Sequence, residues 1–217
     1  MNTRRRKDSG AVGLEGDAII GGMNKRLKSQ FSVTALLVGV NVVIFVLQWV
    51  FPSAEALLLA HGMLDTPAIL QNGEWYRLVT SVFLHADPQH LSSNMIILYF
   101  LGVLVERALG GTSYLLLYLC AGIVGNLASL WMQLQEGSFY QSLGASGAVF
   151  GVVGAYLVLL LRNRRRIRRG DLMRVMFGVF YSLYIGFQST GINNAAHVGG
   201  FCSGAIITLL LLLGRVA

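Results

Sequence analysis

The chain has 217 residues, of which 54% are hydrophobic and 12% are charged. Soluble domains usually carry about 25% charged residues, so this composition excludes a protein whose whole surface faces water. The net charge of +7 does not indicate nucleic-acid binding, because nearly all basic residues lie in two clusters beside hydrophobic segments. Such clusters set membrane topology and bind anionic lipids. We therefore expect an integral membrane protein that contacts the lipid bilayer and binds no nucleic acid.

The first basic cluster lies in residues 1–30, which are polar and hold too few apolar residues to bury a core. We predict that this segment is a flexible cytoplasmic arm. The second cluster, residues 162–169, lies between two apolar segments. Because a chain of this length favours a single domain, we predict that residues 31–217 form one membrane domain.

Apolar segments of roughly 20 residues are expected to cross the bilayer as helices. The predicted fold is therefore an all-α bundle of six transmembrane helices, at residues 32–51, 88–105, 113–134, 145–161, 172–190 and 195–214. Lysine and arginine are concentrated on the side of the N-terminal arm, whereas the outer connections hold one basic residue, Arg77. The positive-inside rule then places both termini in the cytoplasm.

The first outer connection, residues 52–87, is long and too apolar for a free loop. It contains Trp75 and Tyr76, whose side chains favour the membrane–water interface. We predict that this connection lies in the outer interface and partly re-enters the protein. The two cysteines, Cys120 and Cys202, lie in apolar segments and are expected to be buried packing residues without a disulfide.

Polar residues inside membrane helices are costly and indicate function. Ser146 begins the predicted fourth helix, within Gly144-Ala145-Ser146-Gly147, and His197 begins the sixth. Taken alone, each has a structural explanation. A small residue such as serine packs membrane helices closely, and a histidine at a helix end reaches interfacial water.

Glycines on both helices strengthen the pairing of these two residues. Gly200 and Gly204 follow His197 on its own helix face. A matching stripe beside Ser146 consists of Gly147, Gly151 and Gly154. Because glycine faces let helices approach closely, we predict that the fourth and sixth helices bring a nucleophile and a base together.

His90 and Asn94 lie one helical turn apart at the start of the second helix, and His85 precedes them in the loop. An uncharged donor pair aimed at one point is what a developing oxyanion needs. The alternative is a hydrogen-bonded pair that only holds two helices together. In the predicted topology the second, fourth and sixth helices all run inward from the outer side. Their polar residues therefore share one depth, which favours a single site.

These motifs resemble those of the rhomboid protease family, over residues 75–204. The resemblance in the site rests on the serine motif, on the histidine helix with its glycines, and on the H-x(4)-H-x(3)-N spacing of His85, His90 and Asn94. Outside the site, Glu106-Arg107 with Gly110 resembles the family's E-R-x-x-G turn. Tyr76-Arg77 stands where the family usually has Trp-Arg, so Trp75 is displaced by one position.

The resemblance implies an intramembrane serine endopeptidase with a Ser146–His197 dyad and with transmembrane proteins as substrates. The implied oxyanion donors are the backbone N–H of Ser146, His90 and Asn94. The implied supporting residues are His85, Gly144, Phe150, Gly200 and Gly204, with Phe150 stacked on the histidine. No cofactor or metal is implied. The short loops with a basic inner arm suit a bacterial inner membrane, with an organelle membrane as the alternative. The oligomeric state does not follow from the sequence.

Three other interpretations compete with a protease. A catalytically inactive member of the same fold would bind membrane proteins without cutting them, but loss of the serine or histidine marks such proteins, and both are present. A transporter or channel would favour inverted repeats and broken helices at the midplane, and the two halves of the sequence do not pair. A metal site formed by His85, His90 and His197 lacks carboxylate or thiolate ligands and outer-shell partners.

Overall fold

The computed structural model describes residues 32–162, 173 and 193–214, and the secondary structure in these ranges is helical. Within them, four helices are long and apolar enough to cross a membrane: α2 (Val33–Val50), α6 (Pro88–Leu109), α7 (Gly111–Glu136) and α10 (Asn194–Leu213). Helix α8 (Ser146–Arg162) is also apolar but has only 17 residues. The predicted fifth helix, residues 172–190, and the arm, residues 1–30, lie outside the described residues.

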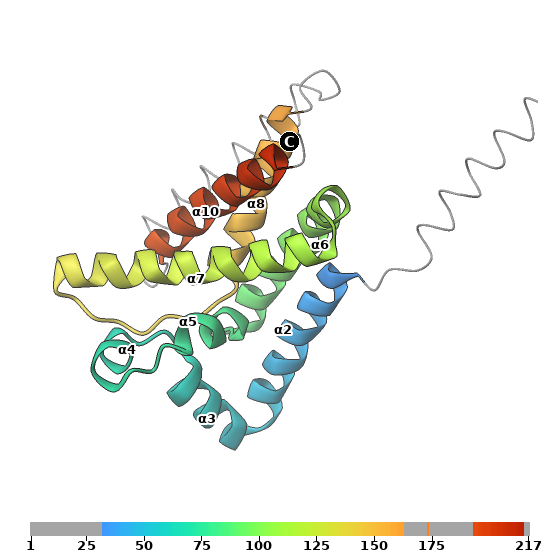
Figure 1. Cartoon of the computed structure of the whole chain (residues 1–217). Coiled ribbons are helices and arrows are strands. Elements are labelled where there is room, and N and C mark those ends of the chain that lie inside the picture. The colour runs from blue at the N-terminus through green and yellow to red at the C-terminus, as the bar shows by residue number, and fades with distance from the viewer. Residues whose placement is uncertain (1–31, 163–172, 174–192, 215–217) are drawn as a thin grey trace, which may run out of the picture. The chain divides into compact units, whose positions relative to one another are not determined.

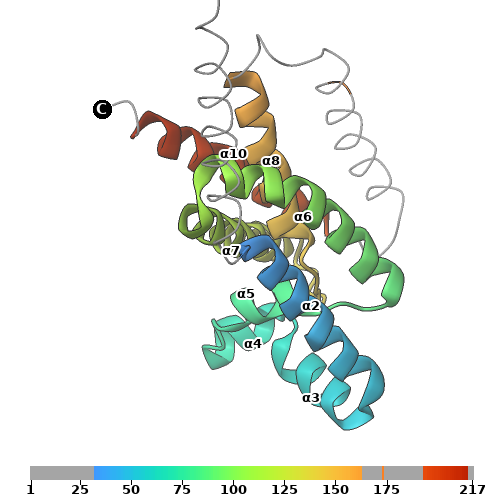
Figure 2. The same cartoon turned by 90° about the vertical axis from the view of Figure 1, so that its right-hand side faces the viewer.

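Helices α7, α8 and α10 pack against one another, and α8 also contacts α6 (Figure 1). Small residues make this packing possible, since much of the buried surface of α8 is glycine, alanine and valine. Helix α2 packs against α6 and against the short helix α3 (Pro52–Gly62) (Figure 2). The buried core is completed by large side chains of α6 and α7, including Leu98, Tyr114 and Tyr118.

Helix α6 continues to Leu109, four residues beyond the predicted end at residue 105. The helix ends at its C-cap, Gly110, and its last turn also contacts another helix. The carboxylate of Glu106 accepts hydrogen bonds from the backbone N–H groups of Val33 at 2.7 Å and Thr34 at 2.9 Å, which caps the start of α2. Gly110 then turns the chain directly into α7 with a φ of 88°. The Glu106-Arg107 motif with Gly110 thus joins three helices.

The connection between α2 and α6 consists of the short helices α3 (Pro52–Gly62), α4 (Thr66–Asn72) and α5 (Arg77–Thr80) and the 3-10 turn η1 (Ser81–Phe83). Its apolar residues divide into two groups. Leu64 and Ile69 are fully buried and pack in a core cluster with Leu130 of α7, whereas Leu57 and Trp75 are exposed. The connection is therefore ordered and packs partly into the protein.

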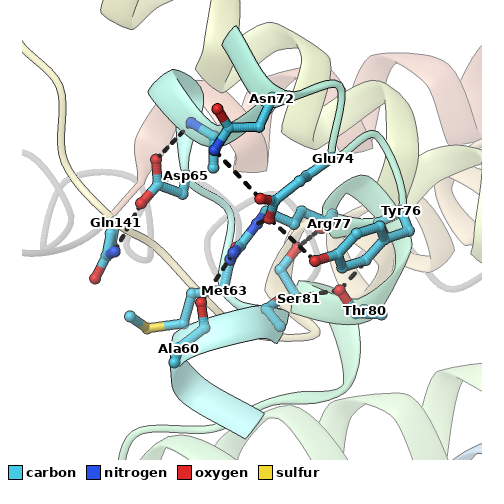
Figure 3. Close-up of polar contacts among 12 residues, drawn as sticks. Ala60, Met63, Asp65, Asn72, Glu74, Tyr76, Arg77, Thr80, Ser81 and Gln141 are labelled. Atoms are coloured by element: carbon cyan, nitrogen blue, oxygen red, sulfur yellow. Dashed lines mark hydrogen bonds and ion pairs between the residues drawn. The ribbon is translucent and has the colours of Figure 1, made fainter. Parts of the chain in front are cut away.

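Arg77 organises this connection from a buried position (Figure 3). Its Nε lies 2.6 Å from the Glu74 carboxylate, and its two terminal nitrogens donate to the carbonyls of Met63 and Ala60, each at 2.9 Å. These carbonyls lie at the C-terminal end of α3, where a cation is favoured. Tyr76, by contrast, is exposed. The arginine of the Tyr76-Arg77 motif therefore holds the connection, and the aromatic residue faces outward.

The loop between α7 and α8 is bound to the same connection. Leu64 and Ser142 exchange two backbone hydrogen bonds, with N···O distances of 2.8 and 3.1 Å. Beside them the side-chain amide of Gln141 donates to Asp65 at 2.7 Å (Figure 3). Further along, the N–H of Gly144 donates to the carbonyl of Ser81 at 2.9 Å. The segment that leads into Ser146 is thus held at several points.

The Asp65–Gln141 contact predicts a pH-dependent contribution to stability. The hydrogen bond from Gln141, followed by that from the Ala68 N–H, lowers the pKa of Asp65 below its usual value of 3.8. Because the folded-state pKa is the lower one, the contribution is complete above pH 3.8 and is lost as the pH falls through the folded value. Gln141→Ala should lower the free energy of unfolding at pH 7 by about 1 kcal/mol or less, since the contact is exposed.

Denaturant unfolding of wild type and Gln141→Ala at several pH values measures this difference. The difference in free energy of unfolding between the two proteins should disappear as Asp65 becomes protonated. Gln135→Ala, which removes an exposed glutamine at the end of α7, is the matched control and should show no such pH dependence. A difference in free energy of unfolding that stays constant down to pH 3 would contradict the role assigned to the Asp65–Gln141 bond.

The expectation that both cysteines are buried is wrong. Cys120 and Cys202 are free thiols with exposed side chains. The error has a physical reason, because an apolar segment need not be buried when the solvent around a helix is lipid. An apolar sequence therefore identifies a segment that lies in the membrane. It does not tell which face of that helix packs against other helices and which face contacts lipid.

Candidate active site

Ser146 is the first residue of α8, and His197 lies in the first turn of α10. The structure brings their side chains together, with Nε2 of His197 2.9 Å from Oγ of Ser146. The ring of Phe150 stacks on the imidazole, with centroids 4.4 Å apart and planes at 11°. Since Phe150 follows Ser146 by one turn, the helix that carries the hydroxyl also orients the imidazole. A neutral imidazole in this position can accept the hydroxyl proton.

The close approach of α8 and α10 depends on glycine. A Cβ atom on Gly200 would overlap the carbonyl oxygen of Gly147, and a Cβ atom on Gly204 would overlap that of Gly151. The obstructing atoms belong to the backbone, so no side chain can move aside to relieve the overlap. The two glycine faces recognised in the sequence therefore meet each other directly.

His90 lies on the other side of the serine motif, against Gly144. A Cβ atom on Gly144 would lie 2.7 and 2.8 Å from two ring atoms of His90 and 3.8 Å from Oγ of Ser146. The imidazole of His90 and the hydroxyl of Ser146 therefore flank the same glycine. Gly144 also has a φ of 135°, a conformation that other residues rarely adopt. Only glycine fits this position without strain.

Asn94 is buried one turn after His90, as the spacing predicted. Its amide donates to the backbone carbonyl of His90 at 2.9 Å, a bond within its own helix. The amide carries two hydrogens, so the second remains for another acceptor. Of the two predicted oxyanion donors, His90 approaches the serine motif at Gly144.

His85 lies behind His90, outside the helices. Its buried ring meets the ring of His90 edge-on, with centroids 5.1 Å apart. Burial, followed by the proximity of His90, lowers the pKa of His85 from 6.5 to about 4. His85 is therefore uncharged at neutral pH and supports His90 by packing.

The described part of the chain contains no group of three or more His, Cys, Asp and Glu side chains placed to hold a metal ion. The metal-site alternative thus finds no support among these residues. In the same residue ranges, Nδ1 of His197 has no hydrogen-bond partner. Stacking on Phe150, and not a carboxylate of these ranges, orients the imidazole.

One residue of this region, Asn193, was not predicted from the sequence. It is the N-cap of α10, and its side-chain oxygen accepts the backbone N–H of Ala196 at 3.0 Å. Asparagine directly before an apolar helix is a known start signal, so the capping role could have been found. Its contacts with other elements could not, because they join residues far apart in the chain.

Comparison with known proteins agrees with the motifs. The Rhomboid domain family matches residues 72–214, a range that contains every residue of the site described above. The rhomboid protease GluP of Bacillus subtilis is 40% identical over 147 residues, or 68% of this chain and 28% of GluP. The rhomboid protease AarA of Providencia stuartii is 30% identical, covering 86% of this chain and 76% of AarA.

A plant protein, RHOMBOID-like protein 1 of Arabidopsis thaliana, is 34% identical over 154 residues, or 70% of this chain and 38% of the plant protein. The similarity therefore extends across bacteria and plants. This chain spans less than a third of GluP but about three quarters of AarA.

Proposed function

The chain belongs to the rhomboid family, and from this premise we propose that it is an intramembrane serine protease with a Ser146–His197 dyad. The observation that carries the proposal is the 2.9 Å contact between Nε2 of His197 and Oγ of Ser146. Serine is a weak nucleophile without an adjacent base. The pairing, inside an apolar helix bundle, supports His197 as that base.

In the proposed reaction, Oγ of Ser146 attacks the carbonyl carbon of the scissile peptide bond while Nε2 of His197 takes the hydroxyl proton. The tetrahedral intermediate collapses, and the leaving amine takes the proton from His197. A water molecule then attacks the acyl-enzyme ester, with His197 again accepting a proton, which it returns to Ser146. The products are an amine and a carboxylic acid, and the enzyme is restored.

The oxyanion of the tetrahedral intermediate needs hydrogen-bond donors beside Ser146. As the first residue of α8, Ser146 has a backbone N–H without an acceptor in its own helix, at the positive end of the helix dipole. We assign His90 and Asn94 as the further donors. The approach of the His90 ring to Gly144, beside the Ser146 hydroxyl, supports this role.

Loss of either donor should lower turnover without weakening substrate binding. Removing one oxyanion donor typically lowers kcat by about 10²–10³, so Asn94→Ala and His90→Ala should each lower kcat and leave KM nearly unchanged. The double variant should lose less than the product of the two, because both donors serve one oxygen. Kinetics with a fluorogenic transmembrane substrate in detergent measure these effects.

Ser93→Ala is the matched control for these variants. Its hydroxyl also bonds the carbonyl of His90, at 2.9 Å, but its side chain is exposed. Ser93→Ala should therefore keep normal turnover. A large rise in KM with kcat intact in Asn94→Ala would mean that Asn94 binds the substrate ground state, and the oxyanion role would be withdrawn.

We propose transmembrane segments of other proteins as the substrates. The dyad lies at the starts of helices that themselves belong in a bilayer, so a membrane-embedded peptide is the substrate class with access to it. We also propose a six-helix topology with cytoplasmic termini, a flexible arm at residues 1–30, and a location in a bacterial inner membrane. The basic residues on one side of the helices support the orientation.

The function is tested by incubating the detergent-purified protein with a panel of single-pass membrane proteins and mapping the cleavage sites by mass spectrometry. We expect cuts in or near the transmembrane segments, and labelling of Ser146 by a serine-reactive fluorophosphonate. A protein that binds these substrates but neither cuts them nor takes the label would be the inactive binder considered in the sequence analysis.

A further inference from the structure

Asn193 connects the residue before α10 to two other elements. Its side-chain amide donates to the hydroxyl of Ser129 on α7 at 2.6 Å and to the hydroxyl of Ser142 at 3.1 Å. Its side-chain oxygen caps the helix at Ala196, and its backbone carbonyl accepts the N–H of His197 at 3.2 Å. One residue thus contacts α7, the loop before α8 and the turn that carries the histidine.

Ser142 stands in the same relation to the nucleophile as Asn193 does to the base. Each precedes its partner by four residues, Ser142 before Ser146 and Asn193 before His197. Ser142 is itself held by two backbone hydrogen bonds to Leu64. The bond between Asn193 and Ser142 therefore joins the segment entering the serine helix to the segment entering the histidine helix.

The bond to Ser129 anchors Asn193 to a buried chain of hydrogen-bonded polar side chains. Ser129 also accepts a hydrogen bond from the amide of Gln133 at 3.2 Å, and the oxygen of Gln133 accepts one from Thr66 at 3.0 Å. Ser129, Gln133 and Thr66 are at most 1% exposed. A buried network whose members are all paired is rigid. Asn193 is therefore bound to a fixed point on α7.

The glycine contacts between α8 and α10 leave a degree of freedom that these bonds remove. Glycine faces set how closely two helices approach, but they carry no side chains that interlock. The His197–Ser146 contact of 2.9 Å does not survive a slide of one ångström or more. Bonds at the start of α10 that run to other elements restrain such a slide.

We propose that Asn193 is a positioning residue for the dyad, which sets the height of His197 opposite Ser146 through its bonds to Ser129 and Ser142. This role rests on the proposed function, because it presumes that the two residues act together. Asn193 does not touch the reacting atoms. It acts through the first turn of α10.

Substitution by serine separates the lateral bonds from helix capping. Serine is as good an N-cap as asparagine, but its shorter side chain cannot cap the helix and also reach Ser129 and Ser142. Asn193→Ser should lower kcat by about 10- to 100-fold, as small misplacements of a catalytic group do. Its KM and thermal midpoint should stay near wild type. Asn193→Ala, which also loses the cap, should lower the thermal midpoint as well.

Ser129→Ala removes the shortest lateral bond from the other side. It should lower kcat in the same way, and the Asn193→Ser/Ser129→Ala double variant should be little worse than the poorer single variant, because both changes break one link. Thr208→Val is the matched control. Thr208 is fully buried in α10, and its hydroxyl donates to the carbonyl of Gly204 in its own helix, at 2.8 Å. Its loss should leave kcat unchanged.

The same assay series includes Ser146→Ala and His197→Ala, so failure of the proposed function is seen separately. If these two variants abolish cleavage while Asn193→Ser and Ser129→Ala keep wild-type kcat, the positioning role is overturned and the dyad stands. Activity retained in Ser146→Ala would instead overturn the proposed function, and the role of Asn193 with it. Effects of Asn193→Ser and Ser129→Ala that multiply independently would also contradict a shared link.

Discussion

Ser146→Ala should retain less than about one per cent of wild-type cleavage activity, because loss of a nucleophile typically costs far more than 100-fold in kcat. The remaining atoms of the site should stay in place. His197 still stacks on Phe150, and alanine at the start of α8 differs from serine by one oxygen atom. The thermal midpoint should therefore be unchanged. Labelling by a fluorophosphonate should disappear together with cleavage.

Ser92→Ala is the control for this prediction. Ser92 is an exposed serine near the start of α6 whose hydroxyl bonds the carbonyl of Gln89 at 3.1 Å. The same change of serine to alanine at this position should leave both cleavage and labelling intact. If Ser146→Ala cleaves membrane substrates at more than about one per cent of the wild-type rate, Ser146 is not the nucleophile.

Gly200→Val should lose activity and stability together. A Cβ atom at position 200 overlaps the backbone carbonyl of Gly147, so α8 and α10 must separate before any larger side chain fits. Overpacking of this kind costs about 1–3 kcal/mol or more. The separation also breaks the contact between His197 and Ser146, which joins the same two helices. We expect a loss of kcat of at least about 100-fold and a lower thermal midpoint.

Gly39→Val is the matched control, because it places the same side chain at another glycine of a membrane helix. Gly39 lies on the exposed face of α2, and a Cβ atom there meets no atom within 4 Å. This variant should keep wild-type activity and nearly wild-type stability. Gly200→Ala should already show part of the defect, since the first methyl carbon causes the overlap. A fully active Gly200→Val with an unchanged midpoint would refute the proposed helix pairing.

The sequence alone determined the class of the protein and the pairing of its central residues. Long apolar runs identify membrane helices because the bilayer requires each segment to satisfy its own backbone hydrogen bonds. The glycines that accompany Ser146 and His197 recur at helical spacing within each helix. A local pattern of this kind therefore predicts which face of a helix packs against another helix, even before that other helix is known. The same reasoning placed His90 and Asn94 on one face of α6.

Helix ends and exposed faces were decided by tertiary structure. The start of α2 is capped by the carboxylate of Glu106, which lies more than 70 residues later in the chain. Cys120 and Cys202 were wrongly expected to be buried, because composition does not tell which side of an apolar helix faces its neighbours.

The polar contacts around the dyad likewise depend on the fold. Arg77 binds the end of α3, Ser142 pairs with Leu64, and Asn193 bonds to Ser129 and Ser142. Each of these contacts joins segments that only the folded chain brings together. Hydrogen bonds between distant segments leave no periodic trace in the sequence, since some partners are backbone groups and the others are ordinary polar side chains. The pattern within a helix predicts which residues can react, and the folded chain decides how they are held in place.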